Sequence, residues 1–197
     1  HKFYLTVFKI RQGEKPVFSR IIEKGSFTLD SGVKSSYNYD YSAVSDTMNR
    51  AYCQLLKYKL DQWQNQHGMF DIVVGIETEG IRIAYQFAEM MELPFTVIPH
   101  KRTDFEQLVK PSWGADPHFL IVDDIVTTGH SMIRAIDFLD IEEKEETVTF
   151  GCMIKRNPSN LDYSAVKGDR SKEEMHIKDR RFDAIDNRLV SLFNEPE

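Results

Sequence analysis

The stretch from His118 to Ser131 constrains the fold more than any other part of the chain. It joins an apolar run, two adjacent carboxylates and a hydroxyl-rich turn. Residues 118 to 122 have the composition of a strand that is buried on both faces of a parallel sheet. Asp123 and Asp124 fall at the carboxyl end of this predicted strand. Because ligands of open α/β sheets bind at the carboxyl ends of the strands, the two aspartates are candidate ligand contacts.

The turn after the aspartates has the features of an anion site at the start of a helix. It supplies hydroxyls, backbone N–H groups and one position without a Cβ, and it leads into a helical pattern at residues 132 to 139. The residues of this predicted phosphate site are Thr127, Thr128, Gly129, His130 and Ser131. An ordinary strand-turn-helix with side-chain caps is the alternative. The adjacent carboxylates favour a site for a phosphorylated sugar, since each raises the cost of ionising the other unless a ligand compensates.

Strands and helices alternate through the middle of the chain. A long amphipathic helix is predicted from about Ser45 to Gln66, a second helix at about 80–91, and strands at 71–76, 94–98 and 147–154. This order predicts an α/β fold with right-handed crossovers and a mostly parallel central sheet flanked by helices. Residues 99–117 lack periodicity and are predicted to form a functional or mobile loop.

The two ends of the chain differ from this core. We expect one domain over residues 1–197, with a core at about 42–154 and a hood formed by residues 1–41 and 155–197. Strands are predicted at 3–10 and at about 17–22, and alternating aromatics at 37–41 predict another. The charged stretch at 167–181 is interpreted as a solvated loop.

Composition excludes several functions. The net charge of −6 argues against a general nucleic-acid binder, which needs clustered Lys and Arg. No apolar run is long enough to span a bilayer, and Cys53 and Cys152 are predicted to be buried free thiols, so we expect a cytoplasmic protein. The six histidines lack zinc spacing, and no Ser-His-Asp or Cys-His nucleophile is indicated.

Three segments together resemble the type I phosphoribosyltransferases, and the orotate phosphoribosyltransferases most closely. Residues 118–131 resemble the family's binding motif for 5-phosphoribosyl-1-pyrophosphate (PRPP). Residues 24–40, Lys-Gly-Ser-Phe-Thr-Leu-Asp-Ser-Gly through Tyr-Asn-Tyr-Asp, are similar to the amino-terminal signature of the orotate enzymes. Residues 74–81 stand in the place of the family's pyrophosphate loop. The resemblance covers about residues 24 to 154.

The resemblance implies a reaction and a role for each segment. The reaction is transfer of ribose 5-phosphate from PRPP to a nucleobase, with Mg²⁺ as cofactor and pyrophosphate as the leaving group. Asp123 and Asp124 would face the ribose hydroxyls and are the candidate metal contacts. The pyrophosphate loop would comprise Glu77, Thr78, Glu79 and Gly80, the base side Lys34, Tyr37 and Tyr39, and the catalytic cations Lys101 and Arg102. The family's mobile loop reaches the neighbouring subunit, so the resemblance also implies a homodimer, with an interface around residues 75–105.

This chain departs from the family pattern at two charged positions. Family members carry lysine where this chain has Asp30 and Glu79. Unit charges about 4 Å apart interact by roughly 4 kcal/mol at an effective dielectric near 20, so two reversals oppose pyrophosphate binding. We therefore expect slow or absent turnover with orotate. Two alternatives stay open: a phosphoribosyltransferase for another base, and a non-catalytic PRPP- or nucleotide-binding regulatory protein.

Overall fold

The computed structural model describes residues 21–29, 33–99, 116–141, 147–157, 160–162, 185 and 187–195. Several predictions concern residues outside these ranges. They are the strand at 3–10, the strand at 17–22 as far as residue 20, most of the loop at 99–117, the charged stretch at 167–181, and the residues Asp30, Lys101 and Arg102.

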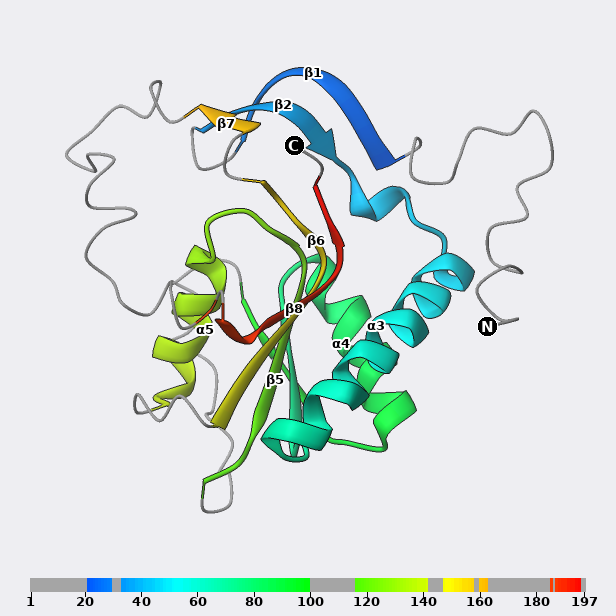
Figure 1. The fold of residues 1–197 in the computed structure, drawn as a ribbon, viewed down its shortest axis with the longest axis vertical. Coiled ribbons are helices and arrows are strands. Elements are labelled where there is room, and N and C mark those ends of the chain that lie inside the picture. Colours follow the sequence, from blue (N-terminus) through cyan, green and yellow to red (C-terminus); the bar gives the residue numbers. More distant parts are fainter. Residues whose placement is uncertain are drawn as a thin grey trace.

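A five-stranded sheet forms the centre of the described structure (Figure 1). Its strands, in spatial order, are β4 (Phe95–Ile98), β3 (Ile72–Ile76), β5 (Phe119–Val126), β6 (Val148–Lys155) and β8 (Leu189–Asn194). All four neighbouring pairs are parallel, which confirms the predicted parallel sheet. The central strands are apolar runs because both of their faces are covered, and every residue of β3 is buried.

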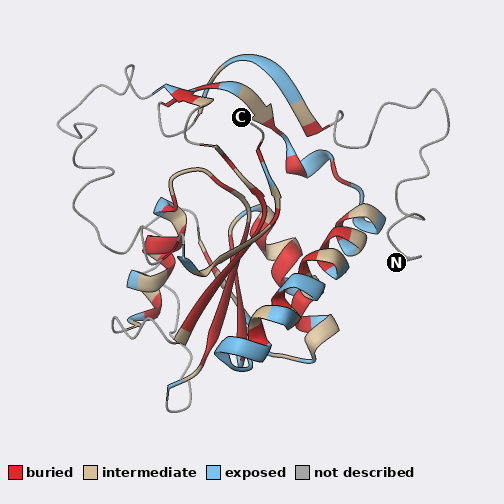
Figure 2. Ribbon diagram, viewed as in Figure 1, coloured by how far each residue is buried: buried red, intermediate tan, exposed pale blue. Residues whose placement is uncertain are grey.

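Three helices cover the two faces of this sheet. The helices α3 (Asp46–His67) and α4 (Glu79–Met91) lie on one face, and α5 (His130–Leu139) lies on the other (Figure 1). Successive side chains of a strand point to opposite faces, so Leu120 joins the core cluster of α3 and α4, whereas Ile121 joins that of α5. Figure 2 shows the strands as the most continuously buried part of the fold.

The long helix α3 forms where the sequence predicts it, and its ends have local causes. The Ser45 hydroxyl accepts a hydrogen bond from the Met48 backbone N–H at 3.4 Å, which caps the start of the helix. At the other end Gly68 has φ +100°, a conformation that side chains with a Cβ rarely adopt.

A second sheet pairs the start of the described chain with a short segment that follows β6. Its strands, in order, are β1 (Ile22–Thr28), β2 (Lys34–Tyr39) and the two-residue β7 (Leu161–Asp162), and both pairings are antiparallel. This small sheet lies beyond one end of the main sheet (Figure 1). A 3-10 turn, η1 (Tyr41–Ala43), leads from β2 towards α3.

Two predicted boundaries are wrong. The strand predicted to end at residue 122 continues to Val126, because β5 keeps its pairing with β6 after its pairing with β3 has ended at Val122. The assignment of residues 155–197 to the hood is also wrong for β8, which extends the main sheet beside β6. Lys59 of α3 holds this edge strand, since its Nζ donates to the Ser191 and Leu192 carbonyls at 2.7 and 3.1 Å.

Within the described ranges, no helix combines the length and apolar character needed to cross a membrane. Both cysteines are buried and free, as the sequence predicts.

Candidate active site

Asp123 and Asp124 lie where β5 separates from β3. The last β3–β5 pair joins Gly75 with Val122, and Asp123 is the next residue along β5. Asp123 is buried, whereas Asp124 is half-buried. The Asp123 Oδ1 accepts a hydrogen bond from the Asp124 backbone N–H at 2.9 Å. The carboxylate pair therefore lies at the carboxyl edge of the sheet, as the sequence predicts.

The surroundings of the pair favour its neutral form. Burial raises the pKa of Asp123 well above its usual value, and the neighbouring Asp124 raises it further. Burial also raises the pKa of Asp124, and the charge of Glu79 adds to this increase. The hydrogen bonds of Asp124 to Asp123 and to the backbone act in the opposite direction and lower the pKa. A cation or a set of hydroxyl donors beside these oxygens would favour the ionised form. The pair is thus suited to a ligand that brings such groups with it.

The turn after β5 opens α5 in the manner of an anion site. Gly129 has φ +76° and ψ +2°, a left-handed conformation that favours glycine, and it stands at the N-cap of α5 without a capping side chain. Thr127, Thr128 and Ser131 are half-buried beside it, and His130 is exposed. The amino end of α5 therefore presents backbone N–H groups and hydroxyls at one place, a combination that suits a phosphate.

The predicted pyrophosphate turn lies against the same edge. Its backbone is fixed to β4, since the Glu77 N–H donates to the Ile98 carbonyl at 2.9 Å, and the Glu77–Thr78 peptide bond is cis. A Cβ on Gly80 would lie 2.8 Å from the Val122 carbonyl oxygen and 3.4 Å from the Asp123 Oδ1. Only glycine allows α4 to begin this close to β5, so the turn and the aspartates meet because residue 80 has no side chain.

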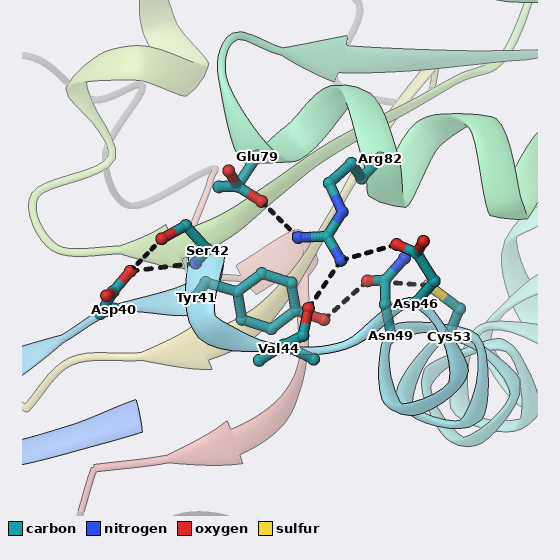
Figure 3. A network of polar contacts seen from close by, with 9 residues as sticks. All are labelled: Asp40, Tyr41, Ser42, Val44, Asp46, Asn49, Cys53, Glu79 and Arg82. Carbon is teal, nitrogen blue, oxygen red and sulfur yellow. Dashed lines mark hydrogen bonds and ion pairs between the residues drawn. The ribbon is translucent and has the colours of Figure 1, made fainter. Parts of the chain in front are cut away.

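Glu79 has a partner in the structure. The Arg82 Nη1 donates to the Glu79 Oε2 at 2.8 Å, one turn further along α4. The Arg82 Nη2 donates to the Val44 carbonyl at 2.8 Å and to the Asp46 Oδ1 at 3.2 Å, so the guanidinium bridges α4 and the start of α3 (Figure 3). The charge of Glu79 is therefore partly offset by a neighbouring cation, which the sequence did not predict.

The residues predicted for the base side lie on β2 and differ in exposure. Lys34 is exposed, Tyr37 is half-buried and Tyr39 is buried. The Tyr39 hydroxyl donates to the Glu195 Oε1 at 2.8 Å, and the Arg156 guanidinium carbon lies 4.7 Å from the centre of the Tyr39 ring. One face of that ring is thus already occupied by a cation.

Arg156 and Glu195 were missed by sequence reasoning. Arg156 directly follows β6 and is buried, and its Nη1 donates at 2.9 Å to both the Ser35 Oγ and the Tyr37 carbonyl. Glu195 directly follows β8 and is also buried. Arg156 could have been found as Asp123 was, because it is a polar residue that follows a predicted buried strand. Glu195 could not, because β8 was not predicted.

Arg156 belongs to the same electrostatic environment as the aspartates. Burial lowers the pKa of its guanidinium, and the charge of Glu195 has the largest opposing effect, with a smaller one from Asp124. Its buried Nε has no hydrogen-bond partner among the described residues. A buried donor without a partner is costly, so this atom marks the carboxyl edge as a place where a polar ligand would be stabilised.

The edge offers oxygen donors for a metal ion but not a complete set. In the described part of the chain, no three His, Cys, Asp or Glu side chains come together as a metal site. Two carboxylates fit Mg²⁺, which prefers oxygen and commonly combines one or two carboxylates with substrate phosphates and water. The residues present therefore suit a magnesium ion that arrives with a phosphorylated ligand.

Comparisons with known proteins agree with this geometry. The Phosphoribosyl transferase domain profile matches residues 54–177. The orotate phosphoribosyltransferase of Sulfurisphaera tokodaii is 29% identical over 142 residues, 64% of this chain and 64% of that protein. The Thermococcus kodakarensis enzyme of the same name is 32% identical over 127 residues, 61% of this chain and 66% of that protein. The matched region thus spans about two thirds of these relatives.

The fold is similar to that of solved phosphoribosyltransferase structures. The crystal structure of orotate phosphoribosyltransferase from Aeropyrum pernix superposes with a TM-score of 0.59 and 22% identity, covering 89% of this chain and 88% of that one. At this identity the likeness shows the fold alone. The family profile covers more than half of the sequence, and it includes the aspartate pair, the α5 turn and the β3–α4 turn. The chain belongs to the phosphoribosyltransferase domain family.

Proposed function

We propose that this protein transfers the ribose 5-phosphate of PRPP to a ring nitrogen of a nucleobase, with release of pyrophosphate, and that the base is orotate or a similar pyrimidine. The observation that carries the proposal is the meeting of three features at one sheet edge: the Asp123–Asp124 pair, the Gly129 turn of α5, and the close approach of Gly80 to β5. The two relatives described above are orotate phosphoribosyltransferases, and this supports the choice of base.

Each feature has a role in this reaction. The amino end of α5 holds the 5-phosphate, because its N–H groups and dipole favour an anion. Asp123 and Asp124 accept hydrogen bonds from the ribose hydroxyls and lie near the positive charge that develops on the sugar. The departing pyrophosphate lies beside residues 77–80. The resemblance to the family assigns the positive charge of this step to Lys101 and Arg102, which are outside the described residues. Mg²⁺, when bound with PRPP, would neutralise the pyrophosphate.

Arg82 bears on the charge reversal at position 79. The 2.8 Å contact between the Arg82 Nη1 and the Glu79 Oε2 places a permanent cation one helical turn from the pyrophosphate turn. This pairing lowers the electrostatic cost that a bare glutamate would impose on a bound pyrophosphate. PRPP binding is therefore opposed less strongly than the presence of glutamate at position 79 suggests. A lysine at this position would still be more favourable than a glutamate paired with arginine.

A non-catalytic PRPP- or nucleotide-binding role is the second candidate, and Glu79 is the observation that favours it. The phosphate turn at Gly129 does not involve Glu79, so binding of a phosphorylated sugar can persist while release of pyrophosphate is impaired. A phosphoribosyltransferase for another base differs from the first proposal only in the acceptor. Both alternatives are separated from the first by measuring binding and turnover independently.

One experiment tests all three readings. The protein is incubated with PRPP, Mg²⁺ and a panel of orotate, uracil, adenine and hypoxanthine, and pyrophosphate release is followed beside calorimetric binding of PRPP. The Asp123→Asn/Asp124→Asn double variant is the site variant, and Asp61→Asn, a half-buried position on α3 paired with Lys57, is the matched control.

The expected result is PRPP binding that the double variant loses and the control keeps, with slow turnover that is greatest for orotate. Turnover with another base only would assign the enzyme to that base, and binding without turnover would favour the regulatory role. Undiminished PRPP affinity in a folded double variant would contradict all three, since each depends on this edge.

We also propose a homodimer that uses the exposed aromatic patch of Tyr85 and Phe95. These residues are 53% and 43% exposed, their rings meet edge to face at 6.0 Å, and they lie on α4 and the edge strand β4. Aromatic side chains are enriched in protein interfaces, so this exposed pair is a candidate contact between two copies. Light scattering should show a dimer that Tyr85→Ser/Phe95→Ser dissociates. The control Tyr58→Ser removes an equally exposed ring from α3 and should leave the dimer unchanged.

A further inference from the structure

A cavity of about 270 Å³ lies at the amino end of the sheet, away from the aspartate pair. His118 directly precedes β5, Thr149 is the second residue of β6, and Arg188 directly precedes β8. The wall on the other side comes from the last turns of α3, with Trp63, Gln66 and His67. Five residues of extended strand, roughly 16 Å, separate His118 from Asp123.

The floor of this cavity is polar and held in place. Thr149 is 1% exposed and His118 is 8% exposed. The Trp63 Nε1 donates to the Thr149 Oγ1 at 3.1 Å, and the His118 Nε2 lies 3.0 Å from the same oxygen. The His118 backbone N–H donates to the Asp71 Oδ2 at 2.8 Å, which fixes the residue at the start of β5. A buried polar floor with fixed orientation is a feature of binding sites.

The upper part of the cavity is aromatic and cationic. The rings of Trp63 and His67 are stacked, with centroids 3.9 Å apart and planes 21° apart. The Arg188 Nη1 donates to the Val148 carbonyl at 3.0 Å, which anchors the guanidinium at the rim. None of the six lining residues is a carboxylate, in a chain that has 31 acidic residues against 25 Lys and Arg. Among these described lining residues, the Arg188 guanidinium is thus the permanently charged group, and it is positive.

We propose that this cavity is a second ligand site that binds a small organic anion, with Arg188 contacting its carboxylate or phosphate group. The guanidinium is suited to either group because both present two oxygens to its fork of N–H donors. The volume corresponds to roughly nine water molecules at about 30 Å³ each, which leaves room for a ring beside the acidic group. The stacked pair of Trp63 and His67 provides an aromatic wall for that ring.

The site is independent of the proposed transferase reaction. It uses none of the residues at the carboxyl edge, and it lies at the opposite end of β5, β6 and β8. Binding to this cavity can therefore be tested with ligands that lack a sugar phosphate. The Asp123→Asn/Asp124→Asn variant changes only the carboxyl edge, so it distinguishes binding there from binding in the cavity.

Trp63 provides a local reporter for the experiment. The sequence has two tryptophans, so a Trp113→Phe background leaves Trp63 as the single indole. Its emission is titrated with benzoate and phenyl phosphate, which distinguish the two acidic groups, and with benzamide, which has the same shape as benzoate but no charge. Arg188→Gln removes the charge at the rim, and Arg50→Gln, on an exposed position of α3 outside the cavity, is the matched control.

The expected result is a saturable change in Trp63 emission with at least one anion and none with benzamide. Arg188→Gln should weaken binding about tenfold to a hundredfold, the range for losing hydrogen bonds to a charged group, and Arg50→Gln should leave it unchanged. The Asp123→Asn/Asp124→Asn variant should bind the anions as the wild type does.

Three outcomes would overturn the proposal: no saturable response to either anion at millimolar concentration, equal binding of benzamide and benzoate, or full affinity in folded Arg188→Gln. The comparison of benzoate with benzamide uses the unmodified Arg188, so the proposal remains falsifiable if the variant does not fold.

Discussion

Replacement of Gly80 by alanine tests how the pyrophosphate turn is held against the aspartates. The added Cβ would lie 2.8 Å from the Val122 carbonyl oxygen, whereas ordinary contacts begin near 3.4 Å. Val122 lies in the middle of β5, between β3 and β6, so its carbonyl cannot move aside. The start of α4 must therefore retreat by roughly 0.6 Å, and overpacking of this kind costs about 1–3 kcal/mol of unfolding free energy.

Chemical denaturation measures this cost, and a thermal scan should show a fall in Tm of roughly 2–12 °C for a domain of this size. Gly151→Ala is the matched control, because its Cβ would meet a side-chain methyl group, the Val122 Cγ1 at 3.2 Å, so the overlap to be relieved is smaller than at Gly80. We expect the control to cost less than Gly80→Ala. PRPP affinity should fall in Gly80→Ala, since the turn moves away from Asp123. An unfolding free energy within about 0.5 kcal/mol of the wild type would refute the argument that this approach requires glycine.

Three further predictions concern buried polar groups. Asp123→Asn should stabilise the unliganded protein, and the gain should increase as pH rises above about 3.8. Folding raises the pKa of the Asp123 carboxyl, so ionisation of this group destabilises the folded wild type, whereas asparagine does not ionise. Urea unfolding at acid and neutral pH measures the difference. Tyr39→Phe should cost about 1–3 kcal/mol in denaturant unfolding, since buried Glu195 loses a donor. Burial lowers the pKa of His118, so its stabilising contribution is present above about 6.5 and is lost as pH falls; His118→Gln should flatten the decline in stability from neutral to mildly acidic pH.

These predictions have distinct points of failure. A stability gain in Asp123→Asn that does not change with pH would show that the carboxyl charge is not the cause. An unchanged unfolding free energy in Tyr39→Phe would mean that water replaces the hydroxyl as donor to Glu195. If His118→Gln kept the full pH dependence, other groups would be responsible for it.

The sequence by itself determined the central units of the fold. The strands and helices from α3 to β6 follow from apolar periodicity and turn residues that are close together in the chain, such as Ser45 and Gly68 at the ends of α3. The position of Asp123 and Asp124 at the sheet edge and the turn at Gly129 that begins α5 are equally local, since a strand, a turn and a helix specify them without help from distant residues. These features were predictable because their causes lie within a few residues.

Tertiary structure decided the features that depend on residues far apart in the sequence. Strand β8 joins the sheet because it packs beside β6 and under α3, and this placement buries Glu195 against Tyr39, 156 positions away. Arg82 pairs with Glu79 and also donates to the Val44 carbonyl, so the sequence at position 79 alone did not reveal the neighbouring cation. Burial and pairing of this kind depend on where the chain places its neighbours, and local periodicity does not specify those neighbours.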